Sequence, residues 1–129
     1  MAMKTDINLS KEEFQKALAG FTGTEMYHLH RSFNGMTLKL TDGCHFVREY
    51  AGEGAYWLFD LILSWQLRLA RHKFQAWELI RQEDATWTIS CSDGNGNHLA
   101  SQRILYSDFP LERFTLWVID GVALLPSEY

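Results

Sequence analysis

The residue whose type and position point most directly to chemistry is Asp60, because it lies inside the most apolar segment of the chain. Phe59 and Leu61 flank it, and large apolar side chains fill most positions from 54 to 70. A carboxylate in such surroundings is either buried with a partner or lies on the one stripe of a helix that faces water. A buried carboxylate with a raised pKa could act as a general acid or base. The alternative is an aspartate that pairs structurally or faces solvent.

Three further residues extend this candidate ligand-binding site. On a helix, Ser64 and Arg68 follow Asp60 by four and eight residues and form a polar stripe with it. Trp57 adds a large aromatic surface near the start of the same segment. The candidate site therefore consists of Trp57, Asp60, Ser64 and Arg68. Its pocket is expected between this helix and the sheet that covers it.

His28 and His30 form a weaker pattern, which resembles part of a zinc site. They lie two residues apart on a predicted strand and so project from one face, where a third ligand would complete the coordination. The expected register puts Lys39 beside them, and a nearby cation disfavours a metal ion. Two solvated histidines are therefore expected, with no metal and no cofactor.

Asp93–Asn97 begins like a calcium-binding loop. However, His98 and Ile104 stand where such a loop needs a glycine and a bidentate glutamate. We expect a polar hairpin turn at this point.

The elements that must position these residues are helices first and strands afterwards. Ser10 and Glu13 fit a capping box for a first helix that ends at Gly20. A short helix near 44–51 and a long one from about 54 to 72 follow, and strands fill the rest of the chain. The order predicts a single α+β domain whose mainly antiparallel sheet, the N-terminal hairpin and about five C-terminal strands, packs on a long central apolar helix.

Asn34-Gly35 predicts the turn of the N-terminal hairpin, because both central residues of a type I′ turn need positive φ. Pairing outward from this turn sets Arg31 opposite Leu38 and Leu29 opposite Leu40. The apolar face of the hairpin, with Tyr27, Leu29 and Phe33, should then be buried. The polar face, with both histidines, should be exposed.

Composition limits the classes of partner. The chain has 129 residues, of which 47% are hydrophobic, and its formal net charge is −4. This charge argues against nucleic acid, and the basic residues from Arg68 to Lys73 are expected to be a solvated helix end. Asp60, Gln66 and Arg68 interrupt the apolar segment, whose uninterrupted runs are far shorter than the roughly 20 residues that span a bilayer.

Cysteine usage and the N-terminus bear on the compartment. Cys44 and Cys91 are the two cysteines, and such low usage is typical of a reducing compartment. The first six residues have no apolar core, so no signal peptide is expected. We expect a cytoplasmic protein without a membrane segment.

Several segments together resemble a known family. They are, in order, Phe21–Glu25 (FTGTE), Leu40–Gly43 (LTDG), Gly54–Asp60 (GAYWLFD), Phe74–Trp77 (FQAW), Tyr106–Pro110 (YSDFP) and Leu124–Tyr129 (LLPSEY). This combination is similar to a family of small uncharacterised proteins of bacteria, plasmids and phages that is known as a domain of unknown function. The resemblance implies a small protein of a mobile element and no activity, cofactor or catalytic residue.

Two functions remain open at this point. The absence of a recognisable catalytic arrangement favours a non-enzymatic interaction or accessory protein that acts through protein-protein contacts. An exposed sheet edge could also serve a homodimer. The alternative is a small ligand-binding domain or enzyme that uses Asp60 and Trp57.

Overall fold

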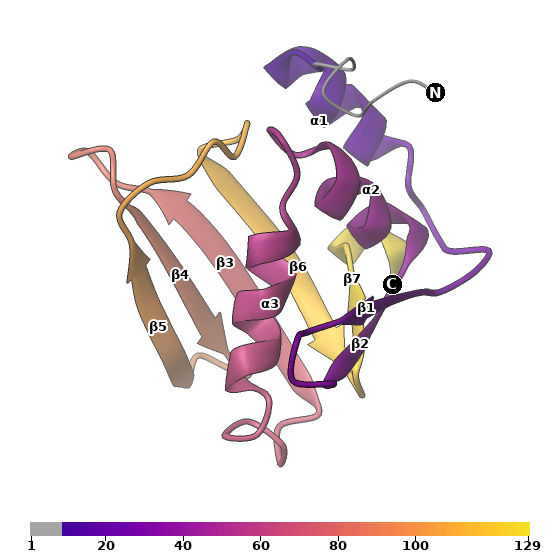
Figure 1. Cartoon of the computed structure of the whole chain (residues 1–129), viewed down its shortest axis with the longest axis vertical. Helices are drawn as coiled ribbons and strands as arrows, with labels where there is room; N and C mark the ends of the chain where they lie inside the picture. Colours follow the sequence, from indigo (N-terminus) through magenta and orange to yellow (C-terminus); the bar gives the residue numbers. More distant parts are fainter. Residues whose placement is uncertain (1–8) are drawn as a thin grey trace.

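A single sheet of seven strands forms one layer of the fold, and helices form the other (Figure 1). The structure is a computed structural model that describes residues 9–129. The helices are α1 (Lys11–Ala19), α2 (Asp42–Tyr50), α3 (Tyr56–Trp65) and the final 3₁₀ turn η2 (Pro126–Glu128). The strands are β1 (His28–Arg31), β2 (Thr37–Leu40), β3 (Phe74–Arg81), β4 (Trp87–Ser92), β5 (His98–Ile104), β6 (Arg113–Ile119) and β7 (Val122–Leu124). The predicted absence of a signal peptide concerns residues outside the described range.

The sheet is mixed, with the strand order β1-β2-β7-β6-β3-β4-β5. All neighbours are antiparallel except β2 and β7, which run parallel and pair Lys39 with Val122 and Leu40 with Ala123. The predicted α+β class and the mostly antiparallel sheet are confirmed. The parallel pair joins the N-terminal hairpin to the last strand of the chain.

The core lies between the sheet and α1, α2 and α3, which all lie on one face of it (Figure 1). Alternate side chains of the central strands point toward the helices, as for Trp77 and Leu79 in β3 and Leu116 and Val118 in β6. The opposite side of these strands is only partly buried, and none of α1, α2 and α3 lies on it within the described residues. We call that side the open face of the sheet.

The predicted long central helix is not confirmed, because α3 ends at Trp65. Gln66 directly follows the helix, and its side chain is held in place: Nε2 donates to Ile62 O at 3.1 Å and to Gln75 Oε1 on β3 at 2.9 Å. This amide pair ties the following turn to β3, so the chain reverses where a continued helix was expected. None of the helices in the described part of the chain has the length and apolarity that crossing a bilayer requires.

The predicted hairpin register is wrong by one residue. His30 pairs with Leu38 and Leu29 with Lys39. The turn has three residues, not two: Ser32 N donates to Met36 O at 2.9 Å, and Gly35 has φ of +86°. This is the geometry of a type I turn followed by a glycine bulge. A one-residue shift moves every side chain to the other face, so the histidines point toward the helices.

Smaller predictions are confirmed. Ser10 and Glu13 form the capping box of α1. The structure also shows that Cys44 and Cys91, for which no pairing was predicted, are free and buried. Burial raises the pKa of the Cys91 thiol to about 12, so it is not a reactive thiolate. Asp93 accepts hydrogen bonds from the backbone of Asn95 and Asn97, as a polar turn requires.

Candidate functional site

Three of the four residues in the sequence-predicted site share one exposed surface. Asp60 and Ser64 lie on the solvent side of α3, and Arg68 lies in the turn after it. The Arg68 guanidinium lies 5.0 Å from the centre of the Trp65 ring. This surface is the polar stripe that the sequence predicts, and it faces water.

Trp57 lies in different surroundings. It lines a hollow of about 380 Å³ at the start of α3, together with Glu53, Gly54, Ile104, Tyr106, Ser107 and Asp108. Asp60 is not part of this lining and pairs with β1 instead. The structure therefore does not bring Trp57 and Asp60 together around one hollow.

Asp60 is both solvated and paired. Its Oδ1 lies 2.8 Å from Nε2 of His30, and its side chain is 56% exposed whereas that of His30 is 2% exposed. The expectation of two solvated histidines is wrong, because the shifted register buries His30. A buried imidazole needs hydrogen-bond partners, and Asp60 is one of them.

Arg48 of α2 is the second partner of His30 and the centre of a larger polar cluster. Its NH1 lies 3.2 Å from His30 Nδ1, its NH2 lies 3.1 Å from His45 Nδ1, and its Nε donates to Glu49 Oε2 at 3.1 Å. The guanidinium also lies 4.8 Å from the centre of the Tyr56 ring. We call the cluster the Arg48 network: His28, His30, Asp42, His45, Arg48, Glu49, Tyr56 and Asp60.

The Arg48 network fixes the protonation of two histidines. A guanidinium only donates hydrogen bonds, so Nδ1 of His30 and Nδ1 of His45 must both accept. His30 then carries its proton on Nε2, where it donates to Asp60. Neither ring can take a proton at Nδ1 without losing its bond to Arg48.

The outer end of the network contains a stacked pair of imidazoles. The rings of His28 and His45 lie 3.8 Å apart and are almost parallel, at 6°. Burial first, and then the positive charges of His28 and Arg48, lower the pKa of His45. His28 Nε2 lies 2.9 Å from Asp42 Oδ1.

Asp42 anchors this end of the network to the rest of the chain. The pKa of its carboxyl is lowered first by the backbone N–H of Glu25 and then by His28. Its own backbone N–H donates to Thr24 Oγ1 at 2.8 Å. Glu128, near the C-terminus, accepts from the hydroxyl of Thr41, the N-cap of α2, at 2.5 Å. Segments from both ends of the chain thus hold the start of α2.

The network does not form a metal site. Within residues 9–129, no group of three or more His, Cys, Asp and Glu side chains has the arrangement to hold a metal ion. The nitrogens that would bind the metal are engaged: His28 and His30 each contact a carboxylate, and His45 contacts Arg48. The arrangement is suited to holding β1, α2 and α3 together.

A second feature is the exposed surface of the N-terminal hairpin. Because His28 and His30 face the helices, Leu29 and Arg31 of β1 and Lys39 of β2 project to the open face. Tyr27 and Leu29 are more than half exposed, and Phe33 at the turn is fully exposed. We call these side chains the hairpin surface: Tyr27, Leu29, Arg31, Phe33 and Lys39.

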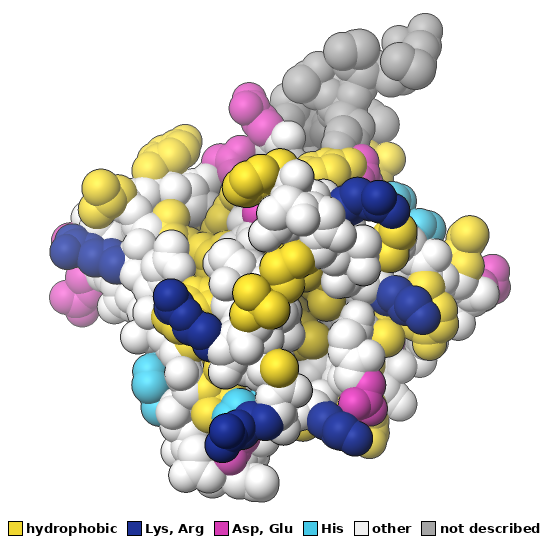
Figure 2. All heavy atoms as spheres, turned by 60° about the horizontal axis from the view of Figure 1, so that its bottom comes forward, with side chains coloured by type: hydrophobic (Ala, Val, Ile, Leu, Met, Phe, Trp, Pro, Cys, Tyr) yellow, Lys and Arg dark blue, Asp and Glu magenta, His cyan; other side chains and the backbone are white. Residues whose placement is uncertain are grey.

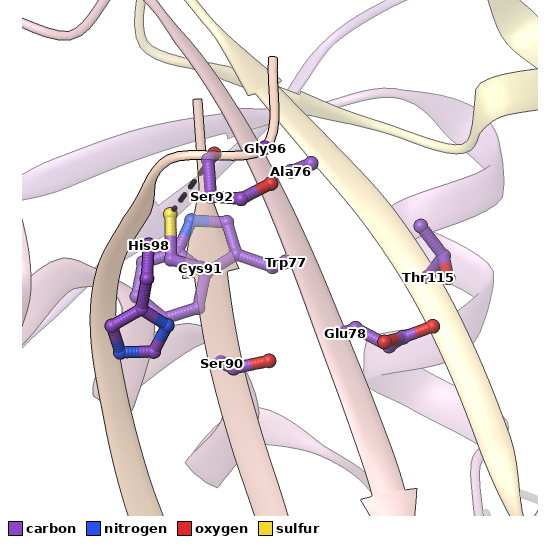
Figure 3. A pocket seen from close by; sticks show the side chains of 9 residues that line it. All are labelled: Ala76, Trp77, Glu78, Ser90, Cys91, Ser92, Gly96, His98 and Thr115. Atoms are coloured by element: carbon purple, nitrogen blue, oxygen red, sulfur yellow. Dashed lines mark hydrogen bonds between the residues drawn. The ribbon is translucent and has the colours of Figure 1, made fainter. Parts of the chain in front are cut away.

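A third feature is a shallow hollow of about 360 Å³ on the open face (Figure 3). Its polar side chains come from four neighbouring strands, with Glu78 on β3, Ser90 on β4, His98 on β5 and Thr115 on β6. Figure 3 shows His98 on one flank, with Glu78 and Thr115 on the other. Among the described residues, Ser90 and Thr115 have no side-chain hydrogen bond, and Glu78 has one ion pair, at 3.6 Å to Arg113.

The sequence held part of the signal for the Arg48 network. Asp42, His45 and Arg48 follow one another at intervals of three residues, which places them on one face of a helix. His28 and His30 share one face of a strand. The register of the hairpin decides whether the histidine face of the strand lies against this face of the helix. The Asn34-Gly35 pair predicts a two-residue turn, and that turn gives the wrong register.

These features define an α+β protein with a mixed seven-stranded sheet, one helix-covered face and a polar network between hairpin and helices. The chain belongs to the family of unknown function DUF6876, whose model matches residues 12–129. Comparisons with curated proteins and with solved structures gave no match. The predicted resemblance to a domain of unknown function is thereby confirmed.

Proposed function

We propose that this chain is a non-enzymatic interaction protein that acts through protein-protein contacts at the hairpin surface. The observation that carries the proposal is the exposure of three large apolar side chains within seven residues: Tyr27 just before β1, Leu29 in β1 and Phe33 in the turn after it. Grouped apolar side chains on a folded surface are typical of an interaction site. Burying one such side chain contributes about 1.5–3 kcal/mol.

The Arg48 network supports this function by holding the hairpin in place. His28 and His30 bind the inner face of β1 to α2 and α3 through contacts of 2.8–3.2 Å. A rigid strand loses little conformational freedom when it binds, and this favours affinity. The network is therefore assigned a supporting role and not a catalytic one.

The setting of this function is also a proposal. The family resemblance suggests an accessory or inhibitor protein of a mobile genetic element in bacteria. Low cysteine usage is consistent with the cytoplasm. A homodimer would form through the edge strand β5, since β1 and β5 lie at the two edges of the sheet and Arg48 contacts the backbone of β1.

Site-specific photo-crosslinking in the native host tests the proposal. A benzophenone amino acid replaces Phe33 in one variant and Leu29 in another, and the matched control replaces Leu105, an exposed apolar residue outside the hairpin. A discrete protein adduct is expected from positions 29 and 33 and not from position 105. Adducts from position 105 alone, or from none of the three, would contradict the proposal.

A second candidate function is binding of a small ligand in the hollow on the open face. The free hydroxyls of Ser90 and Thr115 beside the Glu78 carboxylate favour it, because this set of groups accepts hydrogen bonds from hydroxyl or amino groups. This second candidate places the small-ligand site on the open face of the sheet, whereas the sequence predicts it between the sheet and the helix.

Ligand-detected NMR with a panel of small polyols and amines tests the second candidate. Binding should be lost in Ser90→Leu, which fills the hollow, and kept in Thr37→Leu, at an exposed position of the distant strand β2. Equal binding by both variants, or no binding by the wild type, would exclude this hollow as the site for those compounds.

A further inference from the structure

We propose that the hairpin surface binds an acidic segment of another protein that also carries apolar side chains. This inference rests on the proposed function and adds the chemistry of the partner. Three observations support this inference: the positive charge of the hairpin, the row of apolar side chains on the neighbouring strands, and the contact of Arg48 with the outer edge of β1.

The hairpin is basic within an acidic chain. From position 27 to position 41 the sequence contains Arg31 and Lys39 and no Asp or Glu, although the whole chain has a formal net charge of −4. Neither cation forms an ion pair with another described residue. Figure 2, which brings the lower end of Figure 1 forward, shows Lys and Arg side chains set among hydrophobic ones, together with Asp and Glu. A negatively charged partner would associate with this surface faster, and pairing of its charges with Arg31 and Lys39 would fix its position on the surface.

The apolar part of the surface continues across neighbouring strands. The paired residues on the open face form one row through β1, β2, β7, β6 and β3: Leu29, Lys39, Val122, Ile119 and Phe74. Each of these side chains is exposed or partly exposed. The row gives a bound segment apolar contacts on both sides of the Lys39 cation.

The face of β1, not its edge, is the available surface. β1 is the last strand of the sheet, and an edge strand usually offers free backbone groups to an added strand. Here the Arg48 NH1 lies 3.4 Å from the carbonyl oxygen of Leu29. This guanidinium occupies one backbone acceptor in the middle of the edge, which disfavours an added strand there and favours contact with the side chains.

Nucleic acid is the competing polyanion, and the observations favour protein. Phosphate binding depends on many neutralising contacts, whereas the hairpin surface presents two cations among three large apolar side chains. Two cations suit one or two carboxylates, and the apolar side chains suit apolar partners.

Crosslinking with the benzophenone amino acid at position 33 tests the inference in three backgrounds: wild type, R31E/K39E and R31K/K39R. Mass spectrometry identifies the partner peptide joined to position 33. The expected peptide is acidic, the adduct falls at least about ten-fold in R31E/K39E, and it is kept within about two-fold in R31K/K39R. An unchanged urea midpoint of the free R31E/K39E protein shows that the variant folds.

The other outcomes overturn the inference in distinguishable ways. A neutral or basic peptide, a peptide of this chain itself, or a nuclease-sensitive adduct would show that the partner is of another kind. An adduct of equal yield in R31E/K39E would show that charge does not select the partner. In the outcomes that identify a peptide, and in the outcome of equal yield, the hairpin surface still binds protein, so the proposed function survives. A nuclease-sensitive adduct would contradict the proposed function as well. Absence of any adduct at positions 29 and 33 would contradict both the proposed function and this inference.

Discussion

Glu128 near the C-terminus accepts a hydrogen bond from the backbone N–H of Gly43 in the first turn of α2, at 2.9 Å between Oε2 and N. Two residues that are 85 positions apart in the sequence therefore meet at a helix N-terminus, where a negative charge is stabilising. The contact depends on the absence of a side chain at position 43. A Cβ there would lie 2.6 Å from Glu128 Oε1 and 2.6 Å from Leu125 Cδ1.

Gly43→Ala should therefore destabilise the protein by about 1–3 kcal/mol, because Glu128 must move and lose its hydrogen bonds. Gly23→Ala is the matched control, since a Cβ at position 23 meets no atom within 4 Å. The free energy of unfolding in urea measures both. Equal values for the two variants would contradict the assigned role of Glu128.

Arg48→Ala should lower the free energy of unfolding by about 3–5 kcal/mol, since it leaves the buried ring of His30 and the partly buried ring of His45 without their donor and Glu49 without its ion-pair partner. Arg113→Ala removes an exposed arginine with one loose ion pair and should cost no more than about 1 kcal/mol. Urea denaturation followed by tryptophan fluorescence gives both values. A loss below about 1 kcal/mol for Arg48→Ala would show that the network does not hold the hairpin.

Asp60→Asn should cost only about 0.5–1.5 kcal/mol, because the amide oxygen still accepts the hydrogen bond from His30. Asp60→Leu should cost more, about 1–3 kcal/mol, since Nε2 of the buried His30 then has no acceptor. Thermal and urea unfolding compare the two variants. A larger loss for the asparagine than for the leucine would show that charge, and not hydrogen bonding, holds His30.

The free energy of unfolding should fall as the pH drops below about 6.5, the usual pKa of histidine in an unfolded chain. The lowered pKa of His45 means that the unfolded state binds this proton more readily than the folded state. Stability is therefore complete above the unfolded pKa and decreases toward the lower folded pKa. Below about pH 4, protonation of Asp42 adds a second loss, because its folded pKa is lowered too.

His45→Gln should flatten the pH dependence of unfolding between pH 7.5 and pH 5. His98→Gln, at an exposed position of β5, should leave the slope as it is in the wild type. Urea midpoints at several pH values measure the slopes. The role given to His45 fails if its variant keeps the wild-type slope.

The predictable part of the fold was the part set by local sequence. The Ser10–Glu13 capping box and the Asp93 turn depend on neighbours within a few residues, and both form as predicted. The end of α3 was missed because Gln66 takes its partner, Gln75, from the following strand. Pairing of β2 with β7 joins distant parts of the chain, and no local pattern indicates it.

The candidate site was predicted only in part, for the same reason. The polar stripe of Asp60, Ser64 and Arg68 follows from helical spacing and is found in the structure. Its partner His30 could not be assigned, because the assumed two-residue turn placed that ring on the wrong face. The burial of Arg48 cannot be predicted from its neighbours in the sequence, since it is the contacts with His30 and His45 that stabilise the buried guanidinium.

The three-residue turn of the hairpin has a consequence for which face of β1 is exposed. The two faces of β1 differ, one with the imidazoles of His28 and His30 and one with Leu29 and Arg31, and the length of the turn decides which face is outward. Insertion or deletion of one turn residue would exchange them without altering any contact residue. The length of the turn therefore decides, without any change in the strand residues, which side chains of β1 the protein presents to solvent.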